Sequence, residues 1–285
     1  MLSIIITHHK TPVLLKLCLK SIKENIGELE YETIIGDSES DREVRAEIQE
    51  KFPAIKFITF KKNIGYAKIV NAGLELAKGE YILILNADII ILKGAIERLL
   101  NFLKERPLVG LVGPQLLTFT NKVQDSCFHF PTLGAILARR TFLGKLKWGR
   151  KKIEEFVVRP MWDTRCPTSN VGHRVSHMGH MSHISNMAVD WVQGSAMMVR
   201  RSAVEKVGLL DERFFMYLED ADWCRRFWQN GFEVVYLPTA QMAHYYYRSS
   251  QSRGGLFDLL FNRYARIHLI SAFKYFWKWR GIKLT

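Results

Sequence analysis

The chain has 285 residues, of which 48% are hydrophobic and 24% are charged. This is an ordinary globular composition, and it excludes an intrinsically disordered chain. The formal net charge of +13 favours an anionic partner, which leaves nucleic acid, a phosphorylated small molecule and an anionic membrane open. The four cysteines lie far apart without a CxxC pair, which argues against a disulfide scaffold or a zinc ribbon and suits a reducing compartment.

Neither a membrane span nor a secretion signal is expected. No stretch reaches the roughly 18 uninterrupted apolar residues of a spanning helix. A strand-like run begins at Ser3 with no basic leader before it, unlike a signal peptide. Both observations predict a cytoplasmic protein.

Short apolar runs alternate with amphipathic stretches over the first 115 residues. The runs predict strands at residues 2–7, 31–36, 55–60, 81–85 and 108–112. Helices are predicted at residues 13–24, from the acidic turn 37–41 through residue 51, and at 66–78 and 93–105. This alternation predicts an α/β fold, in which a parallel sheet is covered by helices on both faces. Ligands are then expected beyond the carboxyl ends of the strands.

The second half of the chain is less regular. Residues 116–189 show fewer periodic runs and contain a basic segment at 139–152. Further on, strands are predicted at 196–199 and 233–237, and helices at 202–207 and from 219 to 230. The last strand is expected to stop at Pro238, because proline cannot donate to a sheet ladder. Residues 245–285 form an aromatic and basic tail.

Two aspartates follow predicted strands. Asp37 comes after Ile34 and Ile35, and Asp88 comes after the run 82–85. A carboxylate at a strand end can hold a divalent metal or accept hydrogen bonds from a ribose or a base. Asp37 is equally compatible with a helix N-cap. Asp88 has apolar sequence on both sides, which makes its charge costly unless it is paired or bound to a metal.

A third acidic feature, Glu219 and Asp220, follows the aromatic run 214–217. Partial desolvation beside an apolar wall raises a carboxyl pKa and makes the group a better base near neutral pH. Acidic residues are also common at a helix N-terminus, and both explanations can hold together.

Asn63 and Gly65 join a predicted strand to a helix that carries Asn71. Glycine lets the backbone approach a ligand, and a helix N-terminus suits an anion. The pattern is neither a GxGxxG nor a P-loop motif, which weighs against a dinucleotide or P-loop site. His244 follows the last strand, where it is either a further metal ligand or a structural histidine. Four more histidines form a cluster that is more typical of a polar loop than of a metal site: His173, His177, His180 and His183.

Taken together, these segments resemble the family 2 glycosyltransferases with the GT-A fold, and within them the bacterial rhamnosyltransferase-type branch. In the first half the resemblance lies in residues 3–7, 34–38, 63–71 and 86–88, where Asn86 and Asp88 stand at the family's DxD motif. In the second half it lies in residues 191–196, 200–201, Gly208, Asp211, and 214–222 with Arg225, which resemble the ED-motif region.

The resemblance implies roles for particular residues. Asp37 would contact the nucleotide base, and Asp88 with His244 would hold Mg²⁺ or Mn²⁺ on the donor's diphosphate. Asp220 would be the general base, supported by Glu219. The resemblance also implies a nucleotide-binding set of Thr7, Asp37, Asn63, Gly65, Asn71, Asn86 and Asp88. Trp191, Gly194 and Tyr217 would belong to the acceptor or sugar pocket.

We therefore predict an inverting, metal-dependent glycosyltransferase that uses a nucleotide-sugar donor such as dTDP-rhamnose in cell-surface polysaccharide biosynthesis. The fold is predicted as GT-A, Rossmann-like, with a mainly parallel central sheet, helices on both faces and a basic, aromatic C-terminal helical tail. Residues 1–115 would bind the nucleotide sugar, residues 116–244 would bind the acceptor and include a variable region at 120–190, and residues 245–285 would form the tail.

The acceptor would be a glycan or a lipid-linked molecule, and the tail offers two interpretations. Its apolar and basic residues would lie along an anionic membrane, at the inner face of the cell membrane, or pack as an ordinary C-terminal helix. Two other functions are weighed against the transferase. A nucleotidyltransferase acting on sugar phosphates lacks support, because no glycine-rich loop follows Thr7. A polyanion-binding protein fits the net charge, yet no specific nucleic-acid partner is expected, because the basic residues cluster outside the acid-lined crevice.

Overall fold

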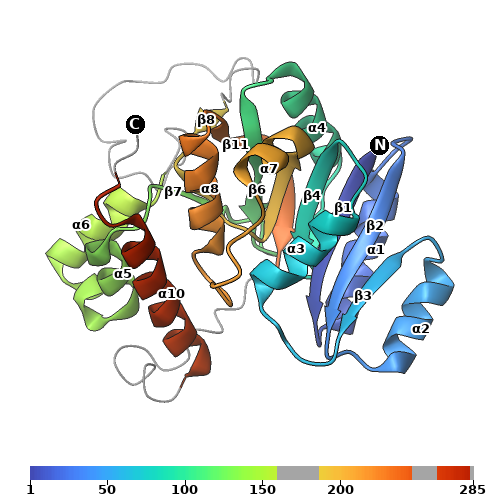
Figure 1. Ribbon diagram of the computed structural model, residues 1–285, viewed down its shortest axis with the longest axis horizontal. Coiled ribbons are helices and arrows are strands. Elements are labelled where there is room, and N and C mark those ends of the chain that lie inside the picture. The colour runs from blue at the N-terminus through green and yellow to red at the C-terminus, as the bar shows by residue number, and fades with distance from the viewer. Residues whose placement is uncertain (159–185, 246–261, 283–285) are drawn as a thin grey trace.

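A computed structural model describes residues 1–158, 186–245 and 262–282. A nine-stranded sheet runs through the molecule in the order β3-β2-β1-β4-β10-β6-β11-β5, with β8 paired to β11 (Figure 1). The sheet strands are β1 (Leu2–His9), β2 (Tyr31–Ser38), β3 (Lys56–Phe60), β4 (Tyr81–Asn86), β5 (Ile89–Ile91), β6 (Val109–Leu117), β8 (Met187–Ala188), β10 (Ala196–Arg200) and β11 (Glu233–His244). A separate pair is formed by β7 (Cys127–Phe128) and β9 (Trp191–Val192).

The helices in chain order are α1 (Pro12–Asn25), α2 (Arg42–Lys51), α3 (Tyr66–Leu76), α4 (Ala95–Glu105), α5 (Leu133–Arg140), α6 (Lys147–Phe156), α7 (Arg201–Val207), α8 (Glu219–Gln229) and α10 (Arg263–Trp279). A short 3₁₀ helix, η1 (Phe142–Lys145), lies between α5 and α6. None of the helices described here is long and apolar enough to cross a membrane.

The first four sheet positions are parallel, as the sequence predicts, and β10 then runs antiparallel to both of its neighbours. Apolar side chains on β1 alternate between the two faces of the sheet. Ile4 and Ile6 pack with α1 and α4, whereas Ile5 packs with α3 and the C-terminal helices. Each buried strand therefore contributes to two cores, which explains its continuous apolar sequence. The predicted GT-A architecture, with helices on both faces of a mostly parallel sheet, is confirmed.

The strand predicted to stop at Pro238 does not stop there. β11 continues through Pro238 to His244, with a shift in its register against β6 between Leu237 and Gln241. This irregularity accommodates the residue that has no N–H to donate. Beyond the shift, β11 pairs with β5, and His244 lies opposite Ile89. The continuation therefore brings His244 beside Asp88.

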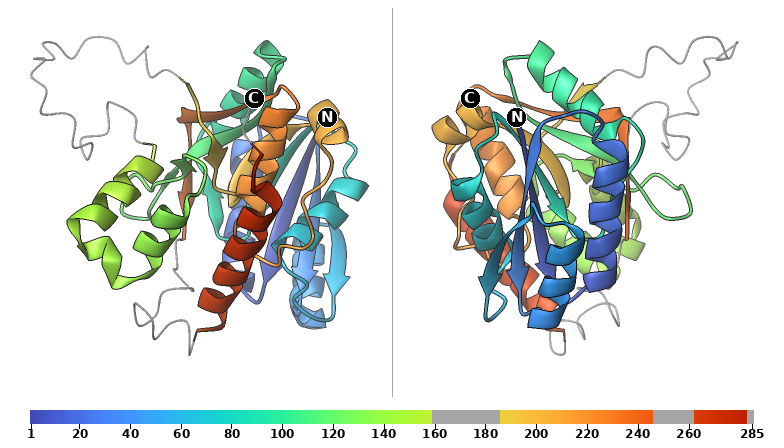
Figure 2. Two further views of the ribbon diagram at one scale, coloured as in Figure 1. Left: turned by 60° about the vertical axis from the view of Figure 1, so that its left-hand side comes forward. Right: turned by 90° about the vertical axis from the view of Figure 1, so that its right-hand side faces the viewer.

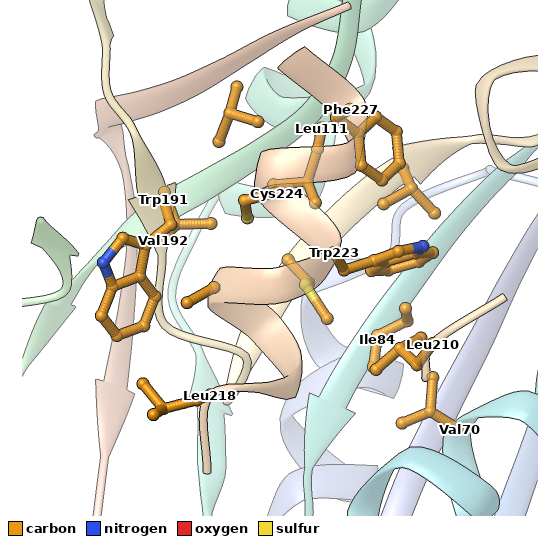
Figure 3. Packing of buried hydrophobic residues seen from close by; sticks show 14 of the residues in the cluster. Val70, Ile84, Leu111, Trp191, Val192, Leu210, Leu218, Trp223, Cys224 and Phe227 are labelled. Carbon is orange, nitrogen blue, oxygen red and sulfur yellow. The ribbon is translucent and has the colours of Figure 1, made fainter. Parts of the chain in front are cut away.

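Helix α8 occupies the centre of the second half of the chain. Its Trp223, Cys224 and Phe227 are fully buried and point toward Leu111 and neighbouring side chains in the core cluster (Figure 3). This packing fixes the position of the acidic residues at the N-terminus of α8. Helix α10 and the α5–α6 pair lie at one end of the molecule, away from α2 (Figures 1 and 2). The predicted basic segment at 139–152 thus contains helix α6 and the end of α5.

Candidate active site

A cleft of about 470 Å³ lies where β1 and β4 end. This is the position at which ligands bind in open α/β sheets. Most of the residues predicted from the sequence line this one cleft: Thr7, Asn63, Asn86, Asp88, Trp191, Gly194, Tyr217, Glu219, Asp220 and His244. Three predicted residues are not among those that line it: Asp37, Gly65 and Asn71.

Asp88 and His244 meet at the end of β4. The Nε2 atom of His244 lies 3.5 Å from an Asp88 carboxylate oxygen. His244 Nδ1 is 3.1 Å from the Gln124 Oε1 atom, an acceptor. This contact places the ring hydrogen on Nδ1 and turns the lone pair of Nε2 toward Asp88.

The other oxygen of Asp88, Oδ1, is buried and has no hydrogen-bond partner among the described residues. A buried carboxylate oxygen without a donor is costly unless a cation or a substrate group satisfies it. In the described part of the chain, no cluster of three or more His, Cys, Asp or Glu side chains forms a complete metal cage. Asp88 and His244 nevertheless fit a Mg²⁺ or Mn²⁺ ion that draws its remaining ligands from substrate phosphates and water.

The acidic pair at the start of α8 is held by backbone geometry. Tyr217 and Leu218 both have positive φ angles, 73° and 67°. This conformation is uncommon for residues other than glycine, and it turns the chain sharply into the helix. Asp220 Oδ2 accepts a hydrogen bond from Gly194 N at 2.9 Å, and Oδ1 accepts one from Ala221 N at 2.8 Å. The Asp220 carboxylate is therefore held in one orientation at the wall of the cleft.

The surroundings of this pair favour its protonated forms. Desolvation by burial raises the pKa of Asp220 to about 6, although backbone hydrogen bonds from Gly194 and Ala221 act in the opposite direction. Glu219 is more deeply buried, and desolvation together with the nearby Asp220 charge raises its pKa well above the usual value. With a pKa of about 6, Asp220 is the member of the pair whose ionised form is favoured near neutral pH. A carboxylate with a pKa near 6 is a competent general base.

Thr7 and Asn86 lie at adjacent strand ends. Thr7 Oγ1 donates a hydrogen bond to Asn86 Oδ1 at 2.9 Å, and the Asn86 backbone N–H donates to Ser195 O at 2.9 Å. Asn86 thus joins the end of β4 to the Gly194–Ser195 segment, which also holds Asp220. The segment links the position of Asp88 to that of Asp220 through backbone hydrogen bonds.

Asp37 is buried behind the cleft. Its Oδ1 is 2.7 Å from His8 Nδ1 and accepts a hydrogen bond from Ser40 Oγ at 2.5 Å. Although burial acts to raise the pKa of Asp37, hydrogen bonds from His8 and Ser40 lower it overall. His8, which sequence analysis did not select, lines the cleft and is oriented by Asp37. The two residues lie opposite each other in the β1–β2 register, so aligning the predicted strands would have paired them.

Gly65 and Asn71 hold the loop before α8. Gly65 has a φ of +91°, and a Cβ atom there would come within 2.3 Å of Phe215 O. The Asn71 carboxamide makes two 2.9 Å hydrogen bonds with the backbone of Leu210, one to its oxygen and one from its nitrogen. Both residues position the loop that leads to Asp220.

The outer half of the cleft is aromatic. Phe128 and Trp191 stack with ring centroids 4.6 Å apart, Phe128 and Phe156 stack at 5.1 Å, and Phe156 also lies 6.1 Å from Trp191, so the three rings form a compact cluster. Arg139 from α5 lies over the rings of Phe128 and Phe156, at 5.4 and 4.9 Å. Only Trp191 was selected from the sequence. The others are far apart in the chain and belong to no motif.

This arrangement, a GT-A sheet whose strand ends carry a metal-compatible aspartate and a desolvated acidic pair, is that of a glycosyltransferase. Comparison with family models agrees with that class. "Glycosyl transferase family 2" matches residues 3–153, and "Glycosyl transferase family group 2" matches residues 156–284. The first match spans more than half of the chain. The chain belongs to glycosyl transferase family 2, which confirms the family resemblance.

Curated relatives include two kinds of rhamnosyltransferase. N-acetylglucosaminyl-diphospho-decaprenol L-rhamnosyltransferase of Mycobacterium tuberculosis is 28% identical over 207 residues, which cover 69% of this chain and 60% of the relative. Rhamnosyltransferase WbbL of Escherichia coli K12 is 26% identical over 284 residues, which cover 96% of this chain and 92% of the relative. The chain therefore spans well under two thirds of the length of the mycobacterial relative.

Solved structures support the fold. The mannosyltransferase PcManGT from Pyrobaculum calidifontis, solved with GDP-Man and Mn²⁺, superposes with a TM-score of 0.54 at 16% identity, covering 87% of this chain and 57% of its own. GalNAc-T7, solved with UDP, GalNAc and Mn²⁺, superposes with a TM-score of 0.64 at 14% identity, covering 86% of this chain and 43% of its own. At these identities the likeness shows a shared fold.

The histidine cluster at residues 173–183 lies outside the described residues, as does the tail between residues 246 and 261.

Proposed function

We propose that the protein is an inverting, metal-dependent glycosyltransferase that moves a sugar from a nucleotide-sugar donor to an acceptor hydroxyl. The observation that carries this proposal is the meeting of Asp88 and Asp220 in one cleft, on either side of the Gly194–Ser195 segment. One carboxylate has an oxygen available to a cation, and the other is desolvated and oriented for a proton. Transfer of a sugar from a diphosphate to a hydroxyl is assisted by positive charge on the leaving diphosphate and by a base for the acceptor proton.

Asp220 supplies the base. Its carboxylate takes the proton from the acceptor hydroxyl while that oxygen forms a bond to the anomeric carbon of the donor. The bond from the anomeric carbon to the diphosphate oxygen breaks on the opposite face, and the nucleoside diphosphate leaves. One displacement inverts the configuration at the anomeric carbon. Glu219 Oε2 is buried without a hydrogen-bond partner among the described residues, so it is available to a polar group of the substrate.

Asp88 and His244 would hold Mg²⁺ or Mn²⁺. When bound, the ion supplies positive charge to the departing diphosphate. Gln124 keeps the His244 ring in the tautomer that this role requires. Thr7, Asn63 and Asn86 line the same part of the cleft and would contact the nucleotide, while Asp37 would act on it through His8.

The finer assignments rest on the relatives together with the shape of the cleft. The two rhamnosyltransferase relatives support L-rhamnose as the sugar, with dTDP-rhamnose as the donor, and a role in cell-surface polysaccharide biosynthesis. The aromatic outer half of the cleft, including Trp191 and Tyr217, suits a glycan or a lipid-linked acceptor. A lipid-linked acceptor would place the protein at the inner face of the cell membrane, as a peripheral protein on the cytoplasmic side.

The test is a donor screen. The protein is incubated with Mg²⁺ or Mn²⁺ and a panel of nucleotide sugars, with glycan and lipid-linked acceptors, and release of nucleoside diphosphate is followed. We expect release from one donor, and loss of that release on chelation of the metal and in Asp88→Asn and Asp220→Asn. Asp41→Asn is a matched control, because Asp41 is exposed at the start of α2 and its side chain makes no capping hydrogen bond.

Activity that survives chelation, or survives both variants, would overturn the metal-dependent mechanism. Absence of release from every donor, together with no change in melting temperature with any nucleotide, would contradict the transferase itself.

A further inference from the structure

Helix α10 presents an apolar stripe to solvent. Leu269, Ile270, Phe273 and Trp277 are 52%, 54%, 68% and 58% exposed. Their spacing puts them on one side of the helix, because side chains three and four residues apart share a face. The opposite side of α10 packs into the protein through Ala272, Tyr275 and Trp279. The helix therefore has two apolar faces, and one of them has no covering element among the described residues.

The exposed stripe is also basic. Arg263, Arg266 and Arg280 lie at helical spacing with the exposed apolar residues and are themselves exposed, and Arg280 lies over the Trp277 ring at 3.7 Å. Helix α10 contains no Asp or Glu. Large apolar side chains, including a tryptophan, among arginines are typical of helices that lie in the interface of an anionic membrane.

Helices α10 and α5 also border the cleft, through the sides that lie away from their exposed apolar residues. His268 of α10 and Ile136 and Arg139 of α5 line the outer part of the cleft, so the two helices flank one opening. Helix α5 adds two exposed residues one turn apart, Leu133 and Leu137, at 62% and 48% exposure. In Figure 1, α5 and α10 lie at the same end of the molecule, and in the left view of Figure 2 the α5–α6 pair lies to the left of α10.

Helix α10 is fixed to the element that carries the acidic pair. Ser271 Oγ donates a hydrogen bond to Met216 O at 2.8 Å, one residue before Tyr217. At the other end of the helix, Lys278 Nζ and Trp279 Nε1 donate to the Asp222 carboxylate of α8, each at 2.9 Å. A surface that docks through α10 therefore holds Asp220 and the cleft in a defined orientation.

We propose that the exposed faces of α10 and α5 dock on an anionic lipid bilayer and so hold the cleft close to the membrane surface. We call this surface, made of Leu133, Leu137, Arg263, Arg266, Leu269, Ile270, Phe273, Trp277 and Arg280, the docking face. The occupant is a lipid surface because its negative charge complements the arginines. A second copy of the chain, related by a two-fold axis, would bring the same arginines against each other. The inference rests on the proposed function in one respect, because the molecule that enters the cleft is taken to be a lipid-linked acceptor.

The test is sedimentation of the full chain with vesicles, without any donor or acceptor. One set contains equal parts of phosphatidylglycerol and phosphatidylcholine, and the other contains phosphatidylcholine alone. We expect binding to the anionic vesicles that weakens with salt. The double variant Phe273→Ser, Trp277→Ser should lower the partition coefficient by roughly tenfold or more. Arg263→Gln with Arg266→Gln should lower it by roughly fivefold for each arginine.

The matched control is Leu76→Ser with Leu108→Ser. These residues are 49% and 67% exposed, and they lie at the end of α3 and just before β6, near the amino ends of the strands, whereas the cleft lies at the carboxyl ends. The control should bind vesicles as the wild type does, and all variants should keep the wild-type melting temperature because only exposed side chains change.

Three results would overturn the docking face: no binding to anionic vesicles, equal loss of binding in the control, or a wild-type dimer that Phe273→Ser, Trp277→Ser separates. The third would make this surface an interface between copies of the chain. Because no sugar is transferred in this assay, binding without transferase activity in the donor screen would contradict the proposed function while leaving the docking face intact.

Discussion

Two regions that meet on helix α8 treat their buried carboxylates in opposite ways. At the cleft, Asp220 accepts hydrogen bonds from backbone N–H groups, and no Lys or Arg side chain among the described residues forms an ion pair with it. Two residues further on, at the interface with α10, Asp222 is surrounded by donors. It pairs with Arg226 at 3.1 Å and with Lys278 at 2.7 Å, and it accepts the Trp279 Nε1 hydrogen.

This difference separates a carboxylate that can exchange a proton from one that holds helices together. Desolvation without a cationic partner raises the pKa of Asp220 to about 6. At the α8–α10 interface the outcome for Asp211 is the reverse. Burial alone would raise its pKa, but hydrogen bonds from Arg213 and Lys278 lower it below the usual range. The hydrogen-bond and ion-pair partners of each carboxylate therefore distinguish the proton-exchanging role from the structural one. The sequence alone shows only acidic residues close together.

The largest expected effect is on catalysis at the cleft. Replacing Asp220 with Asn keeps the shape of the side chain and removes the base, so kcat should fall by roughly a thousandfold. The substrate KM should change little, because Asn still accepts a hydrogen bond from Gly194 N. Initial rates with the donor found in the screen measure both parameters. A variant that keeps more than a tenth of wild-type kcat would remove Asp220 from the role of base.

The next effect is on stability at the interface. Asp222→Ala leaves Arg226, Lys278 and the Trp279 N–H without their shared acceptor, and it should cost about 3 kcal/mol of unfolding free energy. Urea unfolding measures this loss, and the rate per folded molecule should stay within about tenfold of wild type. The double variant Asp222→Asn, Lys278→Met should recover part of the stability, since it removes the charge of Asp222 together with that of one of its two cationic partners, while Arg226 keeps its charge. A mutant as stable as wild type would show that the interface charges contribute nothing.

Much of the first half of the fold can be predicted from sequence, because local periodicity decides it. The run at residues 81–85 and the helix at 66–78 have enough apolar residues on the expected faces to define β4 and α3. β11 shows the limit. Its local signal, Pro238, indicates an end, but pairing with β5 and β6 on both sides carries the strand through. Tertiary pairing outweighs the single missing hydrogen bond.

The residues of the candidate site also divide into those that the sequence could predict and those that it could not. Asp88 and Asp220 could be selected because each follows an apolar run, which makes an acid conspicuous. Asn71 was placed in the predicted nucleotide-binding set. Its structural role could not be recognised from the sequence, because its contact with Leu210 joins residues far apart in the chain. The aromatic stack of Phe128, Phe156 and Trp191 depends on the pairing of β7 with β9 and on the position of α6, which no local pattern encodes.

A smaller effect is expected on the pH dependence of kcat, which tests whether Asp220 exchanges a proton. If Asp220 acts as the base with a pKa of about 6, kcat should rise about tenfold per pH unit below pH 6 and level off above it. The pKa of Glu219 is raised well above its usual value by burial and by the nearby Asp220 charge. Rates measured across the acid limb, with melting curves to exclude unfolding, test the assignment. A profile that is flat between about pH 5 and pH 7 would contradict it.

The smallest expected effect is on stability. Removing the Asp220 charge should stabilise the protein, contrary to the usual expectation for the loss of a charged group. The pKa of Asp220 is about 6 in the folded protein against a usual value of 3.8, so the folded state binds this proton more tightly. Ionisation of Asp220 therefore costs stability as pH rises from about 4 to 6, and the full cost remains above pH 6. Asp220→Asn should stabilise the protein by about 1 kcal/mol near pH 7.5, and the gain should shrink toward zero as pH approaches about 4. Urea unfolding of wild type and variant at the two ends of this range measures the difference. A variant less stable than wild type at the higher pH would mean that the Gly194 and Ala221 hydrogen bonds outweigh the cost of desolvation, and that the cleft stabilises its carboxylate much as the α8–α10 interface does.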